Sequence, residues 1–256
     1  MSVWFRKLMF LTAVTYSLVL PGKAQVTSIS HSWGAGPVSR GSMAEIRGRN
    51  LAERIEGITT IANIPTVLGG VSVHIDGVPC QLYYVSPELI QLVIPDEIPQ
   101  PQVTFIPRRP VWIAPNVAKV SGFMTHEYKF YLTDTAPWWN LSNGYPQGIV
   151  ISPTPPFLFA VIEKGVIPVS EGSRVRLVAS GARSFRPSDQ IFYKILFLPE
   201  GGSELLETPC DVFKDPVIPG SDLVTWDIPL SWKGKKGWIY LQTPSNFSEG
   251  APVEFQ

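Results

Sequence analysis

Hydrolytic sites commonly depend on histidine, and this chain has three, His31, His74 and His126. A serine nucleophile needs a histidine within hydrogen-bond reach, usually with a carboxylate behind it. The chain has no Gly-x-Ser-x-Gly motif, and no local spacing places a serine beside a histidine. We therefore expect all three histidines to be solvated surface residues. The sequence predicts no catalytic residues.

Clustered carboxylates would indicate a metal site, but the acidic residues are scattered along the chain. Asp211 and Asp215 lie on either side of a short segment, and Asp134 stands alone. The Asp-x-Asp-x-Asp-Gly spacing of a calcium loop is absent. We predict no metal site and no cofactor. One weakly bound calcium ion in a loop is the open alternative.

Aromatic residues offer a different chemistry, because the C–H face of a sugar packs against an exposed aromatic ring. Trp138, Trp139 and Tyr145 lie close together near the middle of the chain and could form such a surface. The alternative is that these rings fill a junction between two domains, where large aromatic side chains are common. We favour packing at a junction and keep sugar binding as the competing hypothesis. Trp226 alternates with aliphatic residues and is predicted to lie in the core.

The two cysteines, Cys80 and Cys210, leave two alternatives open. A disulfide is chemically allowed in an exported protein. It requires the two Cα atoms to lie within about 7 Å, and comparable positions in two tandem domains seldom approach so closely. We therefore favour two buried free thiols over a disulfide between Cys80 and Cys210.

The composition bounds the class of protein. The 256 residues include 21 basic and 21 acidic ones, so the chain lacks the basic footprint of a nucleic-acid-binding protein. Hydrophobic residues make up 45%, too many for an intrinsically disordered chain. The 25 prolines and 21 glycines favour many short strands joined by turns over long helices.

The first 24 residues have the layout of a secretory signal peptide. Arg6 and Lys7 precede an apolar run from Leu8 to Leu20, and the small residues Gly22 and Ala24 stand before Gln25. We expect cleavage after residue 24. The mature protein would then be secreted, whether periplasmic, on the cell surface or extracellular, with no membrane span.

A repeated pattern indicates two copies of one domain. Pro37-Val38-Ser39-Arg40-Gly41-Ser42 recurs as Pro168-Val169-Ser170-Glu171-Gly172-Ser173, and the segment 89–95 recurs as 223–229. One cysteine lies between these landmarks in each copy. Three landmarks in the same order make a duplication the best explanation.

Within each copy the hydrophobic pattern is that of half-buried strands. Val71, Val73 and Ile75 alternate strictly with polar residues, and Asp76-Gly77 then favours a tight turn. No window of 11 or more residues shows convincing helical periodicity. The fold class predicted is all-β, with two tandem immunoglobulin-like sandwiches over residues 26–135 and 151–256, and a linker over 136–150.

The segments 68–73, 76–79, 82–87 and 89–95 carry a resemblance to a known family. Their order, Gly-Gly-Val-x-Val-x-Ile-x-Gly-Val-Pro followed by Tyr-Val-Ser-Pro and a strand ending in Ile-Pro, resembles the Solibacter-type uncharacterised C-terminal domain. That family is related to the IPT/TIG immunoglobulin-like domains. The resemblance implies this fold and an exported location. It implies no catalytic residues.

These observations together favour a non-catalytic exported interaction module, which would bind a protein or a polysaccharide through edge strands and loops. The first alternative is a secreted hydrolase of polysaccharide or peptide. For a glycosidase, two carboxyl groups would have to converge to within about 5–9.5 Å. The second alternative is a structural spacer with no ligand of its own.

Overall fold

The computed structural model describes residues 25–34, 36–98, 115–122, 125–152, 159–184 and 193–256. Their regular structure consists of β-strands and one short 3₁₀ helix, η2 (Leu230–Trp232), which confirms the predicted all-β class. The described residues contain no helix that is long and apolar enough to cross a membrane. The signal peptide predicted over residues 1–24 lies outside the described residues and stays a prediction.

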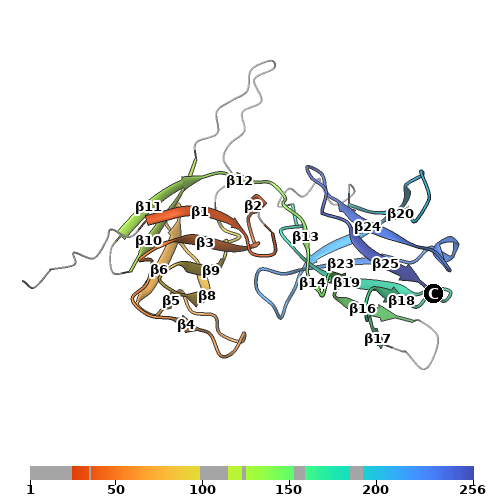
Figure 1. Ribbon diagram of the computed structural model, residues 1–256, viewed down its shortest axis with the longest axis horizontal. Coiled ribbons are helices and arrows are strands. Elements are labelled where there is room, and N and C mark those ends of the chain that lie inside the picture. The colour runs from red at the N-terminus through yellow and green to blue at the C-terminus, as the bar shows by residue number, and fades with distance from the viewer. Residues whose placement is uncertain (1–24, 35, 99–114, 123–124, 153–158, 185–192) are drawn as a thin grey trace, which may run out of the picture.

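The chain forms two units side by side, each with its own hydrophobic core (Figure 1). The first unit spans residues 25–133. Its strands in chain order are β1 (Gln25–His31), β2 (Val38–Ser39), β3 (Met43–Arg49), β4 (Glu56–Gly57), β5 (Val67–Leu68), β6 (Val71–Ile75), β7 (Val78–Pro79), β8 (Gln81–Val85), β9 (Leu89–Val93), β10 (Asn116–Ser121), β11 (Thr125–Phe130) and β12 (Leu132–Thr133).

The second unit spans residues 138–256. Its strands are β13 (Trp138–Trp139), β14 (Leu141–Ser142), β15 (Tyr145–Pro146), β16 (Gly148–Ile151), β17 (Phe159–Val161), β18 (Val166–Ile167), β19 (Arg174–Ser180), β20 (Lys194–Pro199), β21 (Leu206–Pro209), β22 (Asp211–Lys214), β23 (Asp222–Asp227), β24 (Lys236–Gln242) and β25 (Ala251–Phe255).

Each core lies between two sheets, and strand alternation explains why. On β6 the side chains of Val71, Val73 and Ile75 are all buried, as the alternation predicts, because every second residue of a strand faces the same side. On β19 the same rule buries Val175 and Leu177, and Trp226, the partner of Val175 on the neighbouring strand β23, lies on the same buried face. The core position predicted for Trp226 is confirmed.

The two units share one strand order. In the first unit one sheet contains β1-β3-β9-β8 and the other contains β11-β10-β6-β7; in the second unit the matching strands are β16-β19-β23-β22 and β25-β24-β20-β21. Each unit also has one parallel pair, β2 with β12 and β18 with β25. The repeated segments 89–95 and 223–229 cover β9 and nearly all of β23, which are equivalent strands, and the repeated hexapeptides directly precede the equivalent strands β3 and β19. The repeat in the sequence thus has a counterpart in the strand order of the two units.

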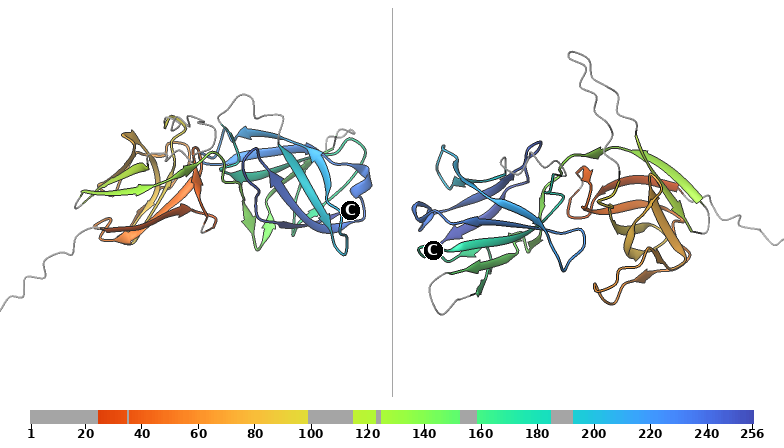
Figure 2. Two further views of the ribbon diagram at one scale, coloured as in Figure 1. Left: turned by 90° about the horizontal axis from the view of Figure 1, so that it is seen from above. Right: turned by 180° about the vertical axis from the view of Figure 1, so that it is seen from behind.

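The segment 136–150 is not a linker. β13 and β16 both pair with β19, and Trp139 and Val150 belong to the second core. Between β13 and β16, the strands β14 and β15 form a hairpin whose turn is Asn143-Gly144, with positive φ at both residues as a tight two-residue turn requires. The chain passes from one unit to the other over residues 134–137 only, and Figure 2 shows this passage in two further views.

Candidate functional site

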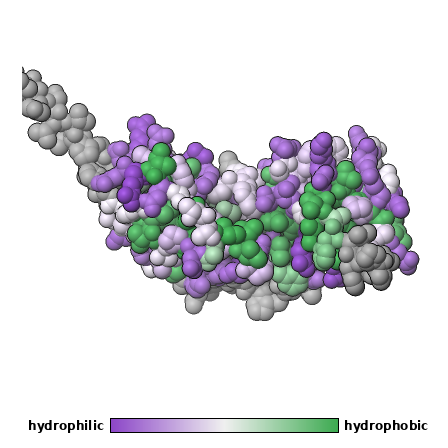
Figure 3. Space-filling view, turned by 90° about the horizontal axis from the view of Figure 1, so that it is seen from below, coloured by the Kyte–Doolittle hydropathy of each residue, from purple (hydrophilic) through white to green (hydrophobic). Residues whose placement is uncertain are grey.

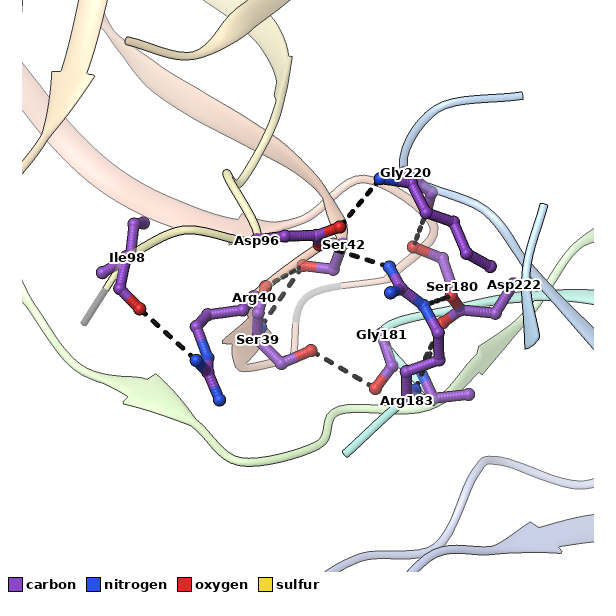
Figure 4. A network of polar contacts seen from close by, with 12 residues as sticks. Ser39, Arg40, Ser42, Asp96, Ile98, Ser180, Gly181, Arg183, Gly220 and Asp222 are labelled. Atoms are coloured by element: carbon purple, nitrogen blue, oxygen red, sulfur yellow. Dashed lines mark hydrogen bonds and ion pairs between the residues drawn. The ribbon is translucent and has the colours of Figure 1, made fainter. Parts of the chain in front are cut away.

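The polar side chains whose types could take part in chemistry meet where the two units touch. They come from the start of β3 and the loop after β9 in the first unit, and from the end of β19 and the β22–β23 loop in the second (Figure 4). Because these segments are far apart in the chain, only the packing of one unit against the other brings them together. We call this region the junction.

His31 and Ser180 form a buried pair in the junction. The His31 Nε2 atom lies 3.1 Å from the Ser180 Oγ atom, and both side chains are almost completely buried. The expectation of a solvated His31 was wrong, because the second unit covers the end of β1. The sequence could not show this contact, which joins residues 149 positions apart.

The hydrogen bonds of this pair argue against nucleophilic chemistry. The backbone N–H of Trp33 donates to His31 Nδ1 at 3.1 Å, so the ring proton lies on Nε2 and points at Ser180. Ser180 Oγ also accepts from the N–H of Met43 and donates to the carbonyl of Gly220 at 2.7 Å. Burial lowers the pKa of His31 to about 3. A neutral ring that donates to the serine cannot act as its base.

The other two histidines lie on the outer sheet of the first unit. His74 on β6 stands opposite Lys119 on β10, and His126 on β11 stands opposite Val120. Both side chains are half-buried. Neither residue is part of the junction.

An ion-pair network crosses the junction beside the His31–Ser180 pair. Arg183 Nε lies 2.5 Å from the buried carboxylate of Asp222, and Arg183 Nη2 lies 3.2 Å from Asp96 of the first unit. Lys214 Nζ is 2.8 Å from the other oxygen of Asp96. Two cations from the second unit thus hold one carboxylate of the first.

Asp222 is the most deeply buried charge of the network. Burial raises the pKa of its carboxyl group, while Arg183 and the backbone N–H of Ala182 act in the opposite direction. Burial also lowers the pKa of Arg183, but Asp222 and Asp96 outweigh it, so that the pKa of the guanidinium is raised. A buried pair of this kind is costly to break, because the remaining partner keeps its desolvation penalty.

A cavity of about 280 Å³ opens next to the network. It is lined by residues of both units, including Gly41, Gln81, Asp96, Glu97, Lys214 and Pro219. Two of its charged groups, Asp96 and Lys214, are already paired with each other. Of the other charged residues in the lining, Arg183 is paired with Asp96 and Asp222, and Glu97 is exposed.

Further hydrogen bonds join the units on either side of the network. The hydroxyl of Tyr83 donates to the carbonyl of Pro219 at 2.7 Å. The hydroxyl of Thr135 lies 2.7 Å from those of Thr243 and Ser245. These contacts extend the junction from the β22–β23 loop to the segment after β24.

Two glycines leave room for close contacts in the junction. Gly41, with φ +68°, belongs to the repeated hexapeptide, and a Cβ atom there would lie 2.4 Å from Asp96 Oδ1 and 2.5 Å from Arg183 Nη2. A Cβ atom on Gly181 would lie 2.4 Å from the carbonyl oxygen of Ala136. A larger residue at position 181 would push the backbone of Ala136 away, whereas one at position 41 would displace the side chains of Asp96 and Arg183.

Trp138, Trp139 and Tyr145 do not share an exposed surface. Trp138 stacks on His31 with ring centroids 5.6 Å apart and packs against Gly34 and Gly36. Trp139 is 3% exposed and lies in the second core, because neighbouring residues of a strand point to opposite sides. Tyr145 packs against Gly165. This arrangement agrees with packing near the junction and not with a sugar platform made of these three rings.

The two cysteines are free and buried, each in a different core. No disulfide links Cys80 to Cys210, and the alternative of two buried thiols describes the structure. Burial raises the pKa of each thiol to about 12, so both are protonated and unreactive in the folded chain.

Within the described ranges, no three histidine, cysteine or acidic side chains are close enough to bind a metal ion together. The chain matches no family model and no curated protein. The resemblance to the Solibacter-type C-terminal domain therefore stays a prediction.

Proposed function

We propose that the protein is a non-catalytic exported interaction module in which two immunoglobulin-like sandwiches are held in one fixed relative orientation. The equivalent strand orders of the two units support the immunoglobulin-like assignment, since each unit has two mostly antiparallel sheets that enclose one core, as in that fold. Export rests on the layout of residues 1–24. The ligand is a protein or a polysaccharide bound on the outer faces.

The observation that carries the proposal is the use made of Ser180. Its hydroxyl lies beside His31 in the junction. The hydrogen bonds of this hydroxyl join His31 and Met43 of the first unit to Gly220 of the second. Arg183 and Asp222 are likewise engaged in holding the units. Fixed domains with satisfied polar contacts suit a protein that presents surfaces rather than one that turns over a substrate.

The exposed surface offers material for such binding. Seen from below, hydrophobic side chains form separate patches among polar ones on both units (Figure 3). The exposed apolar residues include Ile55, Val67, Phe159, Phe213 and Trp238. Contiguous exposed apolar patches on a protein surface are commonly sites of recognition.

The test is to immobilise the mature chain and expose it to envelope fractions, culture medium and soluble polysaccharides. The proposal expects saturable, reversible binding, with the bound molecule recovered chemically unchanged. Release of shortened products, abolished by Ser180→Ala, would support the hydrolase instead. A chain that retains no ligand from any fraction would contradict the proposal in favour of the spacer.

A further inference from the structure

The outward face of β24 carries an unusual row of side chains. Lys236, Trp238, Tyr240 and Gln242 point to the same side, because alternate residues of a strand share a face. Phe247 forms an isolated bridge with Gln242, so its side chain joins the same face. We call Trp238, Tyr240 and Phe247 the aromatic strip. In Figure 1 the strands β24 and β20 of the sheet that bears it lie on the upper side of the second unit.

The rings of the strip are accessible to solvent. Trp238 is 42% exposed and Phe247 is 61% exposed, while Tyr240 is half-buried. Successive outward residues of a strand are about 7 Å apart, so the rings of Trp238 and Tyr240 occupy adjacent places along β24. Exposed aromatic rings in one row are more than the scattered single exposures expected of any surface.

Neighbouring residues fix the positions of the rings of Trp238 and Tyr240 on the sheet. Trp238 stands between Leu198 on β20 and Pro252 on β25. The ring of Tyr240 lies over Gly250, where a Cβ atom would come within 2.8 Å of the ring carbons. A side chain at residue 250 would lift the ring, so this glycine lets the ring lie low against the sheet.

The first unit provides an internal comparison for this face. β10 is the strand equivalent to β24, and its outward residues are Val117, Lys119 and Ser121. Lys119 is flanked by His74 on β6 and by Glu127 on β11. In the first unit the same topology therefore has a lysine, and not an aromatic residue, at the centre of this face. The aromatic strip is not a requirement of the fold.

Two ion pairs flank the strip. At one end Lys236 lies 3.0 Å from Glu254, and at the other Lys194 lies 2.8 Å from Glu207. A face with paired charges favours an uncharged ligand over a polyanion or a basic peptide. The strip is also narrow, whereas a stable protein partner buries about 800 Å² on each side.

We propose that the aromatic strip binds a neutral polysaccharide chain that lies along β24. The C–H groups of each sugar carry a slight positive charge and pack on the negative face of an aromatic ring. The polar residues at both ends, Lys236 with Glu254 and Gln242 with Lys194, can exchange hydrogen bonds with sugar hydroxyls. This inference rests on the proposed function and names the ligand class and the surface that bind.

Affinity electrophoresis of the full mature chain tests the proposal. Native gels would contain hydroxyethyl cellulose, galactomannan or dextran as neutral probes, and polygalacturonate as an acidic one. We expect retardation by at least one neutral polysaccharide. Trp238→Ala should weaken it at least tenfold, Tyr240→Ala should weaken it several-fold, and Trp238→Phe should retain part of it because a ring remains.

Phe213→Ala is the matched control, since Phe213 is an exposed ring, 55% accessible, on the opposite sheet. It should leave retardation unchanged, and unfolding temperatures should confirm that all variants fold. Gly250→Val, which keeps all three rings but lifts Tyr240, should weaken binding as well.

Three outcomes would overturn the inference: no retardation by any neutral probe, equal retardation of the wild type and Trp238→Ala, or stronger retardation by polygalacturonate. These outcomes differ from failure of the proposed function. If another ligand is bound elsewhere and recovered unchanged, the module stands and only the strip is refuted.

Discussion

Strands β9 and β23 are equivalent in the two units, yet the acids at their starts have opposite surroundings. Glu88, just before β9, is exposed at the free end of the first unit. Asp222, which begins β23, is 1% exposed and bound to Arg183. The duplicated fold supplies the position, and contact with the other unit decides whether the acid is solvated or buried. Acids at equivalent positions of the two units should therefore contribute very differently to the free energy of unfolding.

Removal of the two acids should give the largest contrast. Asp222→Ala leaves Arg183 with a single carboxylate partner in a partly buried site, and we expect a loss of about 3 kcal/mol in unfolding free energy. Glu88→Ala should change it by less than about 0.5 kcal/mol. Urea denaturation measures both. Equal losses of unfolding free energy in the two variants would show that the buried contacts of Asp222 do not stabilise the protein.

The two glycines of the repeated hexapeptide give the next contrast. Gly41 and Gly172 both have positive φ, +68° and +72°. Gly172→Ala should cost about 1 kcal/mol, the penalty for a left-handed conformation. Gly41→Ala should cost about 2 kcal/mol, because its Cβ atom would also displace the contact between Asp96 and Arg183. Thermal unfolding of the two variants under identical conditions makes the comparison.

His31 should make stability depend on pH. Its pKa is 6.5 in the unfolded chain and about 3 in the folded one. Between these values the unfolded state binds a proton that the folded state does not. The unfolding free energy should therefore fall as the pH decreases below 6.5, by up to about 1.4 kcal/mol per pH unit, and be unaffected by His31 above it.

The measurement is the difference in unfolding free energy between the wild type and His31→Gln from pH 4 to 8. The difference should shrink toward acid pH, since the variant lacks the titrating ring. His74→Gln, on the outward face of β6, is the control that makes the same substitution and keeps His31. A constant difference across the range would contradict the assignment of a neutral buried His31.

The smallest effect is expected at the cysteines, which are alike in the two units. Neither Cys80 nor Cys210 should react with an aromatic disulfide reagent in the folded protein, since both are buried. Both should react after denaturation without reductant. Peptide mapping under non-reducing conditions should find no linkage between them, and detection of one would refute the separate cores.

Much of the fold could be predicted locally. The strict alternation along β6 predicted that Val71, Val73 and Ile75 are buried, and the structure confirms it. The aliphatic neighbours of Trp226 predicted a core position, which is also confirmed. The boundary between the units was missed, because Trp138 and Trp139 lie in a strand of only two residues. A strand that short has no detectable periodicity, and its pairing with β19 is what defines it.

The candidate site was harder to predict, because its contacts join the two units. Nothing local distinguishes Ser180 from the other serines, or Asp222 from the exposed acids. Trp238 and Tyr240 do alternate on one strand, a signal that the sequence contains. Whether such rings face a core or solvent depends on what packs against that side of the sheet.

By itself, the sequence determined the all-β class and the faces of the longer strands, because alternation and turn residues act over a few neighbouring positions. Tertiary structure alone decided which polar groups became buried at the junction. Burial and ion pairing depend on surfaces brought together from distant parts of the chain, and the free energy of a charged or polar side chain follows from those surroundings.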